Sequence, residues 1–278
     1  MKKKIENNEI PQDQINRIYL QDCIAGMAKL PEKSIDVIIS DPPYNLSSGQ
    51  NINFEGGKVV AGMGGEWKKT MEKWDNMSLS DYFSFSYSWL AEAKRVLKPT
   101  GSMWIFGTYH NLGIINVVCQ LLGLEIINEV IWYKSNAFPN LSGRRLTASH
   151  ETLLWVHNSP KKRQYKFNYD YSKNGDFDYD SLKAPGKQMR TVWSIPNNKE
   201  RWEIQFGKHP TQKPIRLIER LIKLTTDEND IVLSPFAGAG TDCVAAALNN
   251  RRYIGFEIEQ DYVNIATSRI SNMPVRLF

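Results

Sequence analysis

A short apolar run that ends in two prolines restricts the fold of this chain more than any other feature. Residues 35–39 read Ile-Asp-Val-Ile-Ile, and Pro42 and Pro43 follow after two further residues. Such a run, rich in β-branched residues, is typical of a strand buried on both faces of a parallel sheet. Proline fixes φ and has no N–H, so the strand must end and the loop after it must be stiff. That loop holds Asp41 and Tyr44, either as a simple strand terminator or as a preshaped pocket for a flat polar group.

Further apolar runs alternate with helical patterns along the chain. Strands are expected over residues 15–20, 34–40, 102–107, 126–134, 230–234 and 253–257, and another apolar run covers 151–157. Helices are expected over residues 23–30, 79–97, 111–122, 211–224 and 241–249, the fourth with Thr211 as its N-cap. Residues 45–75, rich in Gly, Asn and Lys, are expected to form a functional or mobile loop. This alternation predicts an α/β fold with a doubly wound, mainly parallel sheet.

Length and composition set broad limits on the class of protein. The chain has 278 residues, enough for one large α/β domain or two small ones, and no apolar run long enough to span a bilayer. A net charge of +5 and a pI near 8.9 are compatible with a polyanionic partner. The three cysteines lack a C-x-x-C spacing and form no zinc-ligand pattern with the four histidines, so no metal site is expected. With no signal peptide in its polar start, the protein is expected to be cytoplasmic.

A second chemical pattern stands near the end of the chain. Residues 231–241 read as a strand, a turn with Gly238 and Gly240, and a helix start. Glycines allow the backbone to approach a ligand at a helix N-terminus. The next strand ends in Glu257, an acid placed to accept hydrogen bonds from two ribose hydroxyls. Because Cys243 replaces the last glycine of G-x-G-x-x-G, a nucleoside is favoured over a dinucleotide; the alternative is a plain glycine turn with a surface acid.

The segment just before this pattern is also rich in polar groups. Residues 208–214 read Lys-His-Pro-Thr-Gln-Lys-Pro at an expected helix start. The free N–H groups of a helix start, together with Lys213, are suited to hold a carboxylate. The alternative is a capped helix with a solvated lysine.

Taken together, these blocks resemble those of the β-class amino-methyltransferases of bacterial DNA, in particular the HinfI/DpnII-type adenine methylases. That family has a D-P-P-Y block early and an F-x-G-x-G block late, a circular permutation of the usual methyltransferase order. Here residues 41–44 and 236–240 carry these blocks. Between them stand Pro139-Asn140, Arg145, His150-Glu151-Thr152, Trp155 and His209-Pro210-Thr211-Gln212-Lys213-Pro214. The resemblance covers residues 14–270 and implies a Rossmann-like methyltransferase sheet, circularly permuted, with an inserted target-recognition region.

The resemblance also implies a cofactor, S-adenosyl-L-methionine, and a set of site residues. The catalytic residues that hold the target base would be Asp41, Pro42, Pro43 and Tyr44. The cofactor-binding residues would be Asp22, Cys23, Asp41, Thr211, Lys213, Ser234, Phe236, Gly238, Gly240, Thr241 and Glu257. Within that set, Asp22 would meet the adenine, Glu257 the ribose, and Thr211 and Lys213 the methionine carboxylate. Ser234 is a departure, because the family usually has Asp before Pro-Phe, so retained but weaker cofactor binding is expected.

The D-P-P-Y block suits methylation of an exocyclic amine, whose lone pair is delocalised into the base. The Asp41 carboxylate and the Pro42 carbonyl can accept both N–H bonds of the amine, and Tyr44 offers a face for a flipped base. Carbon-5 cytosine enzymes need a cysteine, usually after proline, and the chain has no Pro-Cys dipeptide. N4-cytosine enzymes tend to have Ser in place of Asp41, so adenine N6 is favoured.

Other functions stay open at this level. They are an N4-cytosine DNA methyltransferase, a non-catalytic nucleic-acid-binding protein with a decayed methylase core, and a methylase of RNA or of protein glutamine. The first differs in the methylated base, the second would not transfer methyl groups, and the third would leave DNA unmodified.

The expected partner is double-stranded DNA, with single-stranded DNA also open and no membrane. Contacts are expected from basic residues interleaved with aromatic ones, namely Arg144, Arg145, Lys161, Lys162, Arg163, Lys187 and Arg190; an ordinary solvated surface is the alternative. Residues 1–157 are predicted as a catalytic half, 158–208 as an inserted target-recognition region, and 209–278 as the cofactor-binding half of the same domain. By resemblance the target is GATC- or GANTC-like and the enzyme pairs with a restriction endonuclease in a restriction-modification system. A homodimer is left open.

Overall fold

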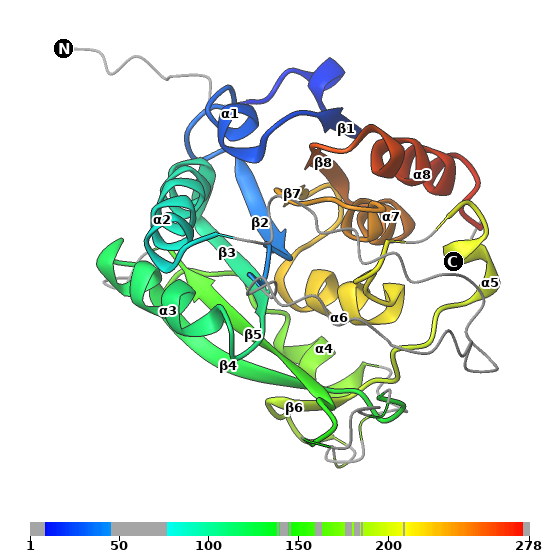
Figure 1. Ribbon diagram of the computed structural model, residues 1–278. Helices are drawn as coiled ribbons and strands as arrows, with labels where there is room; N and C mark the ends of the chain where they lie inside the picture. Colours follow the sequence, from blue (N-terminus) through cyan, green and yellow to red (C-terminus); the bar gives the residue numbers. More distant parts are fainter. Residues whose placement is uncertain are drawn as a thin grey trace.

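The computed structural model of this chain describes residues 9–45, 77–137, 139, 144, 146–158, 163–175, 180, 184, 186–207 and 209–274. They form an eight-stranded sheet in the order β1-β8-β7-β2-β3-β5-β4-β6 (Figure 1). The strands are β1 (Arg17–Leu20), β2 (Ile35–Ser40), β3 (Leu97–Gly107), β4 (Glu125–Tyr133), β5 (His150–His157), β6 (Val192–Ser194), β7 (Ile231–Ser234) and β8 (Arg252–Glu257). The helices are α1 (Cys23–Met27), α2 (Leu79–Val96), α3 (Leu112–Leu121), α4 (Tyr169–Asn174), α5 (Arg201–Ile204), α6 (Ile215–Thr225), α7 (Thr241–Leu248) and α8 (Gln260–Ser271), with a 3-10 turn at Gln12–Gln14.

The sheet is mostly parallel. Strands β1, β8, β7, β2 and β3 pair in parallel along the sheet, and so do β4 and β6. Among the described strands only β5 runs antiparallel to its neighbours, β3 and β4. The prediction of an α/β fold with a mainly parallel sheet is therefore confirmed.

Helices cover both faces of the sheet (Figure 1). Helices α1, α2 and α3 pack on one face, and α6 and α7 pack on the other. Strand β2 shows why, because Ile38 packs with the first set while Val37 and Ile39 pack with the second. All three side chains are fully buried, as the apolar run predicts. Nowhere in the described part of the chain does a helix have the length and apolar character needed to cross a membrane.

The expected start of helix α6 is wrong. The helix begins at Ile215 with Pro214 as its N-cap, four residues after Thr211. The ring of Pro214 disfavours helical backbone at the residue before it. The Gln212 N–H is instead bonded to the carbonyl of His209 in a turn. Residues 209–214 therefore form a separate segment, free to point side chains at the strand ends.

Other differences lie where the sequence pattern is weak. Strand β3 starts at Leu97, five residues before the expected start, because the chain pairs with β2 at Leu97 and again from Ser102, with residues 98–101 bulging out between them. The pattern does not predict β6, α4, α5 or α8. The long loop expected over residues 45–75 lies outside the described residues except for Asn45.

Two stacked indoles join β3 and β5 to α6. The ring centroids of Trp104 and Trp155 are 5.1 Å apart, and the Trp104 Nε1–H donates to Thr225 Oγ1 at 3.2 Å. We expect Trp104→Ala to lower the free energy of unfolding by roughly 3–5 kcal/mol. Thr225→Val, which removes the hydroxyl that accepts from Trp104 and donates to the Leu221 carbonyl, should cost roughly 1–3 kcal/mol. Urea unfolding measures both; a loss for Trp104→Ala no larger than that for Thr225→Val would contradict this packing role.

Candidate active site

The site lies at the edge of the sheet where the parallel strands end. Strands β1, β8, β7 and β2 are parallel neighbours, so their carboxyl ends meet at one edge. The chain leaves β2 toward α2 on one face and leaves β7 toward α7 on the other. Adjacent strands whose helices go to opposite faces create a crevice, which is the usual ligand position in open α/β sheets.

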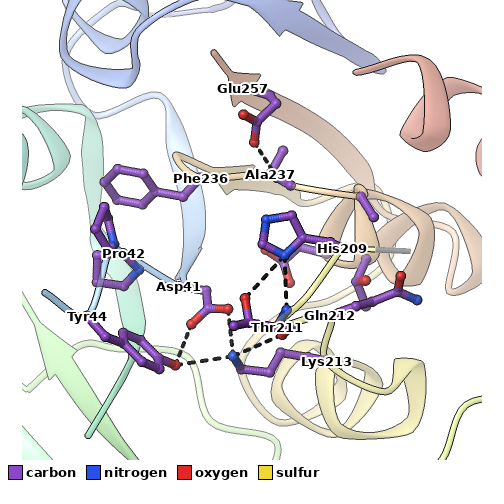
Figure 2. Close-up of a pocket in the computed structure, with 15 residues that line it drawn as sticks. Asp41, Pro42, Tyr44, His209, Thr211, Gln212, Lys213, Phe236, Ala237 and Glu257 are labelled. Atoms are coloured by element: carbon purple, nitrogen blue, oxygen red, sulfur yellow. Dashed lines mark hydrogen bonds and ion pairs between the residues drawn. The ribbon is translucent and has the colours of Figure 1, made fainter. Parts of the chain in front are cut away.

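The crevice contains two adjoining hollows that share Pro43, Phe236 and Glu257. One, the polar hollow, is lined by Asp41, Pro42, Pro43, Tyr44, His209, Thr211, Gln212, Lys213, Phe236, Ala237, Gly238, Ala239, Thr241, Asp242 and Glu257 (Figure 2). The other, the apolar slot, is lined by Gln21, Asp22, Cys23, Pro43, Met77, Phe85, Pro235, Phe236, Phe256, Glu257 and Ile258. The structure thus brings together all of the predicted catalytic and cofactor-binding residues except Ser234 and Gly240, which lie behind the walls.

A chain of charged side chains fixes the floor of the polar hollow. Lys213 Nζ donates to Asp41 Oδ2 at 2.6 Å and lies 3.2 Å from Glu151 Oε2 (Figure 2 shows the first contact). Lys134 Nζ donates to the other oxygen of Glu151 at 2.9 Å. The Tyr44 hydroxyl donates to Asp41 Oδ1 at 2.5 Å and accepts from Lys213 at 3.2 Å. Two carboxylates and two ammonium groups therefore share one nearly neutral cluster.

Burial and neighbouring charges set the protonation of this cluster. Burial raises the pKa of Asp41, and the attraction of Lys213 only partly opposes it. Burial alone would also raise the pKa of Glu151, but Lys213 and Lys134 outweigh it and lower that pKa. Burial acts to lower the pKa of Lys213, yet Asp41 and Glu151 outweigh it and raise that pKa. Lys213 is therefore a fixed cation, and Asp41 is a strong hydrogen-bond acceptor.

The loop after β2 is anchored on its outer side as well. The Tyr82 hydroxyl of α2 donates to the Pro43 carbonyl at 2.8 Å, and Asn45 exchanges two hydrogen bonds with the backbone of Met77. The Tyr44 side chain is only 7% exposed, and Lys213 Nζ lies 5.3 Å from the centre of its ring. Its observed contacts hold Asp41 in place, and its predicted stacking on a base stays a prediction.

The glycine turn after β7 forms the roof of the polar hollow. Gly238 has φ +50° and Gly240 has φ +73°, a region that favours glycine. The Gly238 N–H donates to Glu257 Oε2 at 2.7 Å, and the other carboxylate oxygen accepts from the backbone of Ile258 and Glu259. A Cβ on Gly240 would lie 2.6 Å from the Cβ of Ala266, so this glycine serves close packing of α8.

The walls of the apolar slot are mainly aromatic and apolar side chains. Phe236 stands between the two hollows, and Trp89 holds it edge-on at a centroid distance of 5.5 Å. Asp22 caps α1 by accepting from the Ala25 N–H at 2.9 Å through one oxygen, and it lines the slot. The slot therefore combines aromatic and apolar walls with an acid at its rim, a combination suited to a purine.

The histidine of the segment before α6 is neutral. Burial, together with Lys213, lowers the pKa of His209 to about 4. Its Nδ1 lies 3.2 Å from Thr211 Oγ1 and accepts from the Thr211 N–H at 3.3 Å. The same segment places Lys213 against Asp41 in the polar hollow. The predicted contact of Lys213 with the methionine carboxylate of the cofactor stays a prediction.

The predicted DNA-binding residues are scattered. Arg145, Lys161 and Lys162 lie outside the described residues, and Arg144, Lys187 and Arg190 are exposed. Arg163 pairs with Glu125, the first residue of β4, whereas the site lies beyond the last residue of that strand. Nine residues of strand span about 30 Å, so Arg163 lies far from the hollow.

Three site residues were missed at the level of sequence: Lys134, Glu151 as part of the ion cluster, and Asp242. Glu151 opens the apolar run 151–157 and belongs to the His150-Glu151-Thr152 block of the resemblance, which gives it no role. Lys134 and Asp242 carry no local signal, because one follows a strand and the other lies in a first helical turn, where acids are common.

Comparison with known proteins identifies the family. The model of the N6_N4_Mtase family, described as DNA methylase, matches residues 35–268. The chain is 39% identical over 251 residues to the type II methyltransferase M2.DpnII of Streptococcus pneumoniae, across 90% of this chain and 87% of that protein. This chain belongs to the DNA methylase family. The predicted class of enzyme, and DNA as its partner, are thereby confirmed.

Solved structures agree with the membership in the DNA methylase family. The crystal structure of the M1.HpyAVI–SAM complex matches with a TM-score of 0.60 and 25% identity, across 91% of this chain and 98% of that one. PvuII DNA methyltransferase (cytosine-N4-specific) has the same fold, with a TM-score of 0.69 and 18% identity across 93% and 87% of the two chains. The complex of M1.HpyAVI contains the cofactor predicted for this methylase.

The ion cluster makes stability depend on pH in a defined way. In Lys213→Met, Asp41 and Glu151 lose a buried cation, so unfolding should become easier by roughly 3–5 kcal/mol at pH 8. The carboxyls would then have folded-state pKa values above their unfolded values, so their stability contribution is present at low pH and lost as pH rises. The deficit relative to the wild type should therefore shrink at pH 5. Denaturant unfolding at the two pH values, with Lys134→Met as a milder control, checks this; an equal deficit at both would contradict it.

Proposed function

We propose that this DNA methylase transfers a methyl group from S-adenosyl-L-methionine to the N6 amine of an adenine in a short, GATC-like DNA site. The observation that carries the proposal is Asp41, a carboxylate that lines the polar hollow and is held by Tyr44 and Lys213. By likeness to the type II methyltransferase M2.DpnII, the enzyme is the modification partner of a restriction endonuclease and acts in the cytoplasm.

The two hollows fit the parts of the cofactor. The apolar slot accepts an adenine ring, and Glu257, shared by both hollows, faces the position of a ribose. The polar hollow, with the glycine turn and Thr211, accepts the amino-acid end. When bound there, S-adenosylmethionine supplies an electrophilic methyl group on a positively charged sulfur.

The residues of this chain act on the amine that receives the methyl group. Each oxygen of Asp41 already accepts one hydrogen bond, from Tyr44 or Lys213, and has a second lone pair for an amine N–H. The Pro42 carbonyl is the second acceptor. Two acceptors draw the nitrogen toward tetrahedral geometry, free its lone pair for attack, and stabilise the positive charge that develops. Burial raises the pKa of Asp41, which makes the carboxylate a better acceptor.

The same features bear on the choice of base and the organisation of the chain. Asp41, where N4-cytosine enzymes tend to have Ser, favours adenine over cytosine. The motif order corresponds to a circular permutation of the usual methyltransferase order, and residues 158–208 form the inserted target-recognition region. The exposed Arg144, Lys187 and Arg190 are the described candidates for DNA contacts, and Arg163 is not among them because of its distance from the hollow.

Asp41→Ala tests this chemistry directly. Loss of a group that stabilises developing charge should lower the single-turnover rate of methyl transfer by about 10²–10³-fold. Affinity for S-adenosylmethionine should change only a few-fold, because Asp41 faces the amine. Tyr44→Phe, which keeps the ring and removes one bond to Asp41, should cost less. A rate for Asp41→Ala above about a tenth of the wild-type rate would contradict the assigned role.

The DNA substrate offers a second test. A flipped adenine must first lose its pairing and stacking, which costs a few kcal/mol in a duplex. We therefore expect tighter binding to a duplex mismatched at the target adenine, and measurable methylation of a single strand with the same site. Binding and single-turnover assays on matched, mismatched and single-stranded oligonucleotides measure this. Strict dependence on the matched duplex would show that flipping is not limiting.

A further inference from the structure

A buried carboxylate on the wall of the polar hollow has no role in the chemistry above. Asp242, the second residue of α7, is 7% exposed and lines the hollow together with Asp41, Thr211 and Gly238. Its Oδ2 accepts a hydrogen bond from the Ser234 hydroxyl at 2.6 Å. Ser234 is fully buried at the end of β7, behind the wall.

Within the described part of the chain, the carboxylate of Asp242 is not in direct contact with a cationic side chain. No ion pair to this carboxylate occurs among residues 9–45, 77–137 and 209–274 or the shorter described stretches between them. Lys213 is engaged by Asp41 and Glu151, and Arg269 donates to the Ala239 carbonyl and to Thr241 Oγ1. Lys213 and Arg269 act on this carboxylate only without direct contact. A carboxylate taken out of water without an ion pair is costly, so its position beside a ligand hollow points to a cation supplied by the ligand.

Asp242 lies next to the residue where the family resemblance leads us to expect an acid. By the family resemblance stated above, an acid is expected at the position of Ser234, and this chain has a hydroxyl there. The hydrogen bond from Ser234 places the carboxylate of Asp242 directly next to that position. Ser234 ends the strand behind the wall, whereas Asp242, in the first turn of the following helix, lines the hollow itself.

We propose that Asp242 binds the α-ammonium group of the cofactor's amino-acid end, and so replaces the acid missing at Ser234. The inference rests on the proposed function, because it assumes that S-adenosylmethionine occupies the two hollows. The plain structural alternative is an acid that stabilises the N-terminus of α7 through the helix dipole. The two differ in ligand selectivity and in their effect on the free protein.

Isothermal titration with two probes separates them. S-Adenosylhomocysteine carries the α-ammonium, and 5′-deoxy-5′-methylthioadenosine lacks the whole amino-acid end. Asp242→Asn should weaken binding of the first roughly 10- to 100-fold, as expected for one charge-assisted bond, and leave binding of the second unchanged. Ser234→Asp combined with Asp242→Asn should restore most of the affinity. Asp261→Asn, an exposed acid in the first turn of α8, is the matched control and should change neither.

The pH dependence of the wild type gives a readout that needs no variant to fold. Burial raises the pKa of Asp242 to about 7. The hydrogen bond from Ser234 and the positive charges of Lys213 and Arg269 act to lower this pKa, and the negative charge of Asp41 acts to raise it. The adjacent His209 and Cys243 are neutral between pH 5.5 and 8, since the pKa of the first is lowered and that of the second raised. Affinity for S-adenosylhomocysteine should therefore fall as pH drops below about 7 in the wild type. In Asp242→Asn this dependence should be reduced to whatever Asp41 contributes.

Thermal unfolding of the ligand-free protein completes the test. The pKa of Asp242 is higher in the folded state than the usual value near 4. The protonated Asp242 carboxyl therefore stabilises the folded protein fully below about pH 4, and this stabilisation is lost as the pH rises through about 7. Asn mimics the protonated form, so Asp242→Asn should raise the melting temperature at pH 8 more than at pH 5.5. A structural acid would instead give a lower melting temperature.

Each result decides one point. Unchanged affinity of Asp242→Asn for S-adenosylhomocysteine, or an equal loss for both probes, overturns the ammonium contact and leaves the proposed function intact. Binding of neither probe by the wild type overturns the cofactor assignment itself.

Discussion

The contact of Lys213 with Asp41 and Glu151 is the interaction on which the rest of the site depends. Lys213 is 5% exposed, so its charge is acceptable only while both carboxylates stay within reach. Those carboxylates come from the loop after β2 and from β5, and Lys134 at the end of β4 completes the cluster. Separating any of these elements would leave a buried charge unpaired. The cluster therefore holds the catalytic loop in one position before a substrate arrives.

The two sides of the crevice are held in place by different contacts and suit different chemical groups. The prolines and Tyr82 hold the loop backbone, and Tyr44 and Lys213 hold the carboxylate that the loop carries. The opposite wall is built from backbone, with Gly238 and Glu257 joined by a hydrogen bond. One side is thus suited to an amine and the other to a nucleoside, and Phe236 separates the two hollows. Preorganised acceptors of this kind need no reorganisation during reaction.

The parts of this arrangement that could be predicted from sequence are local. The burial of β2 follows from its apolar run, the end of that strand from Pro42 and Pro43, and the glycine turn from Gly238 and Gly240. The ion cluster could not be predicted, because its longest contacts join residues 107 and 172 positions apart, and nothing in the sequence around Lys134 or Lys213 indicates a partner. Helix α6 starts later than its amphipathic pattern suggests because Pro214 restricts the residue before it. The sequence does not show which acid lies beside Ser234, because that acid, Asp242, belongs to the next helix.

The central claim is that the pocket around Asp41 methylates adenine N6 in DNA. The most direct measurement is nucleoside mass spectrometry of DNA from cells that express the wild-type chain, compared with DNA from cells that express Asp41→Ala, combined with methylation-aware sequencing. The account predicts N6-methyladenine at one short recurring site in the first sample and its absence in the second. N4-methylcytosine in its place, or N6-methyladenine that persists with Asp41→Ala, would contradict it.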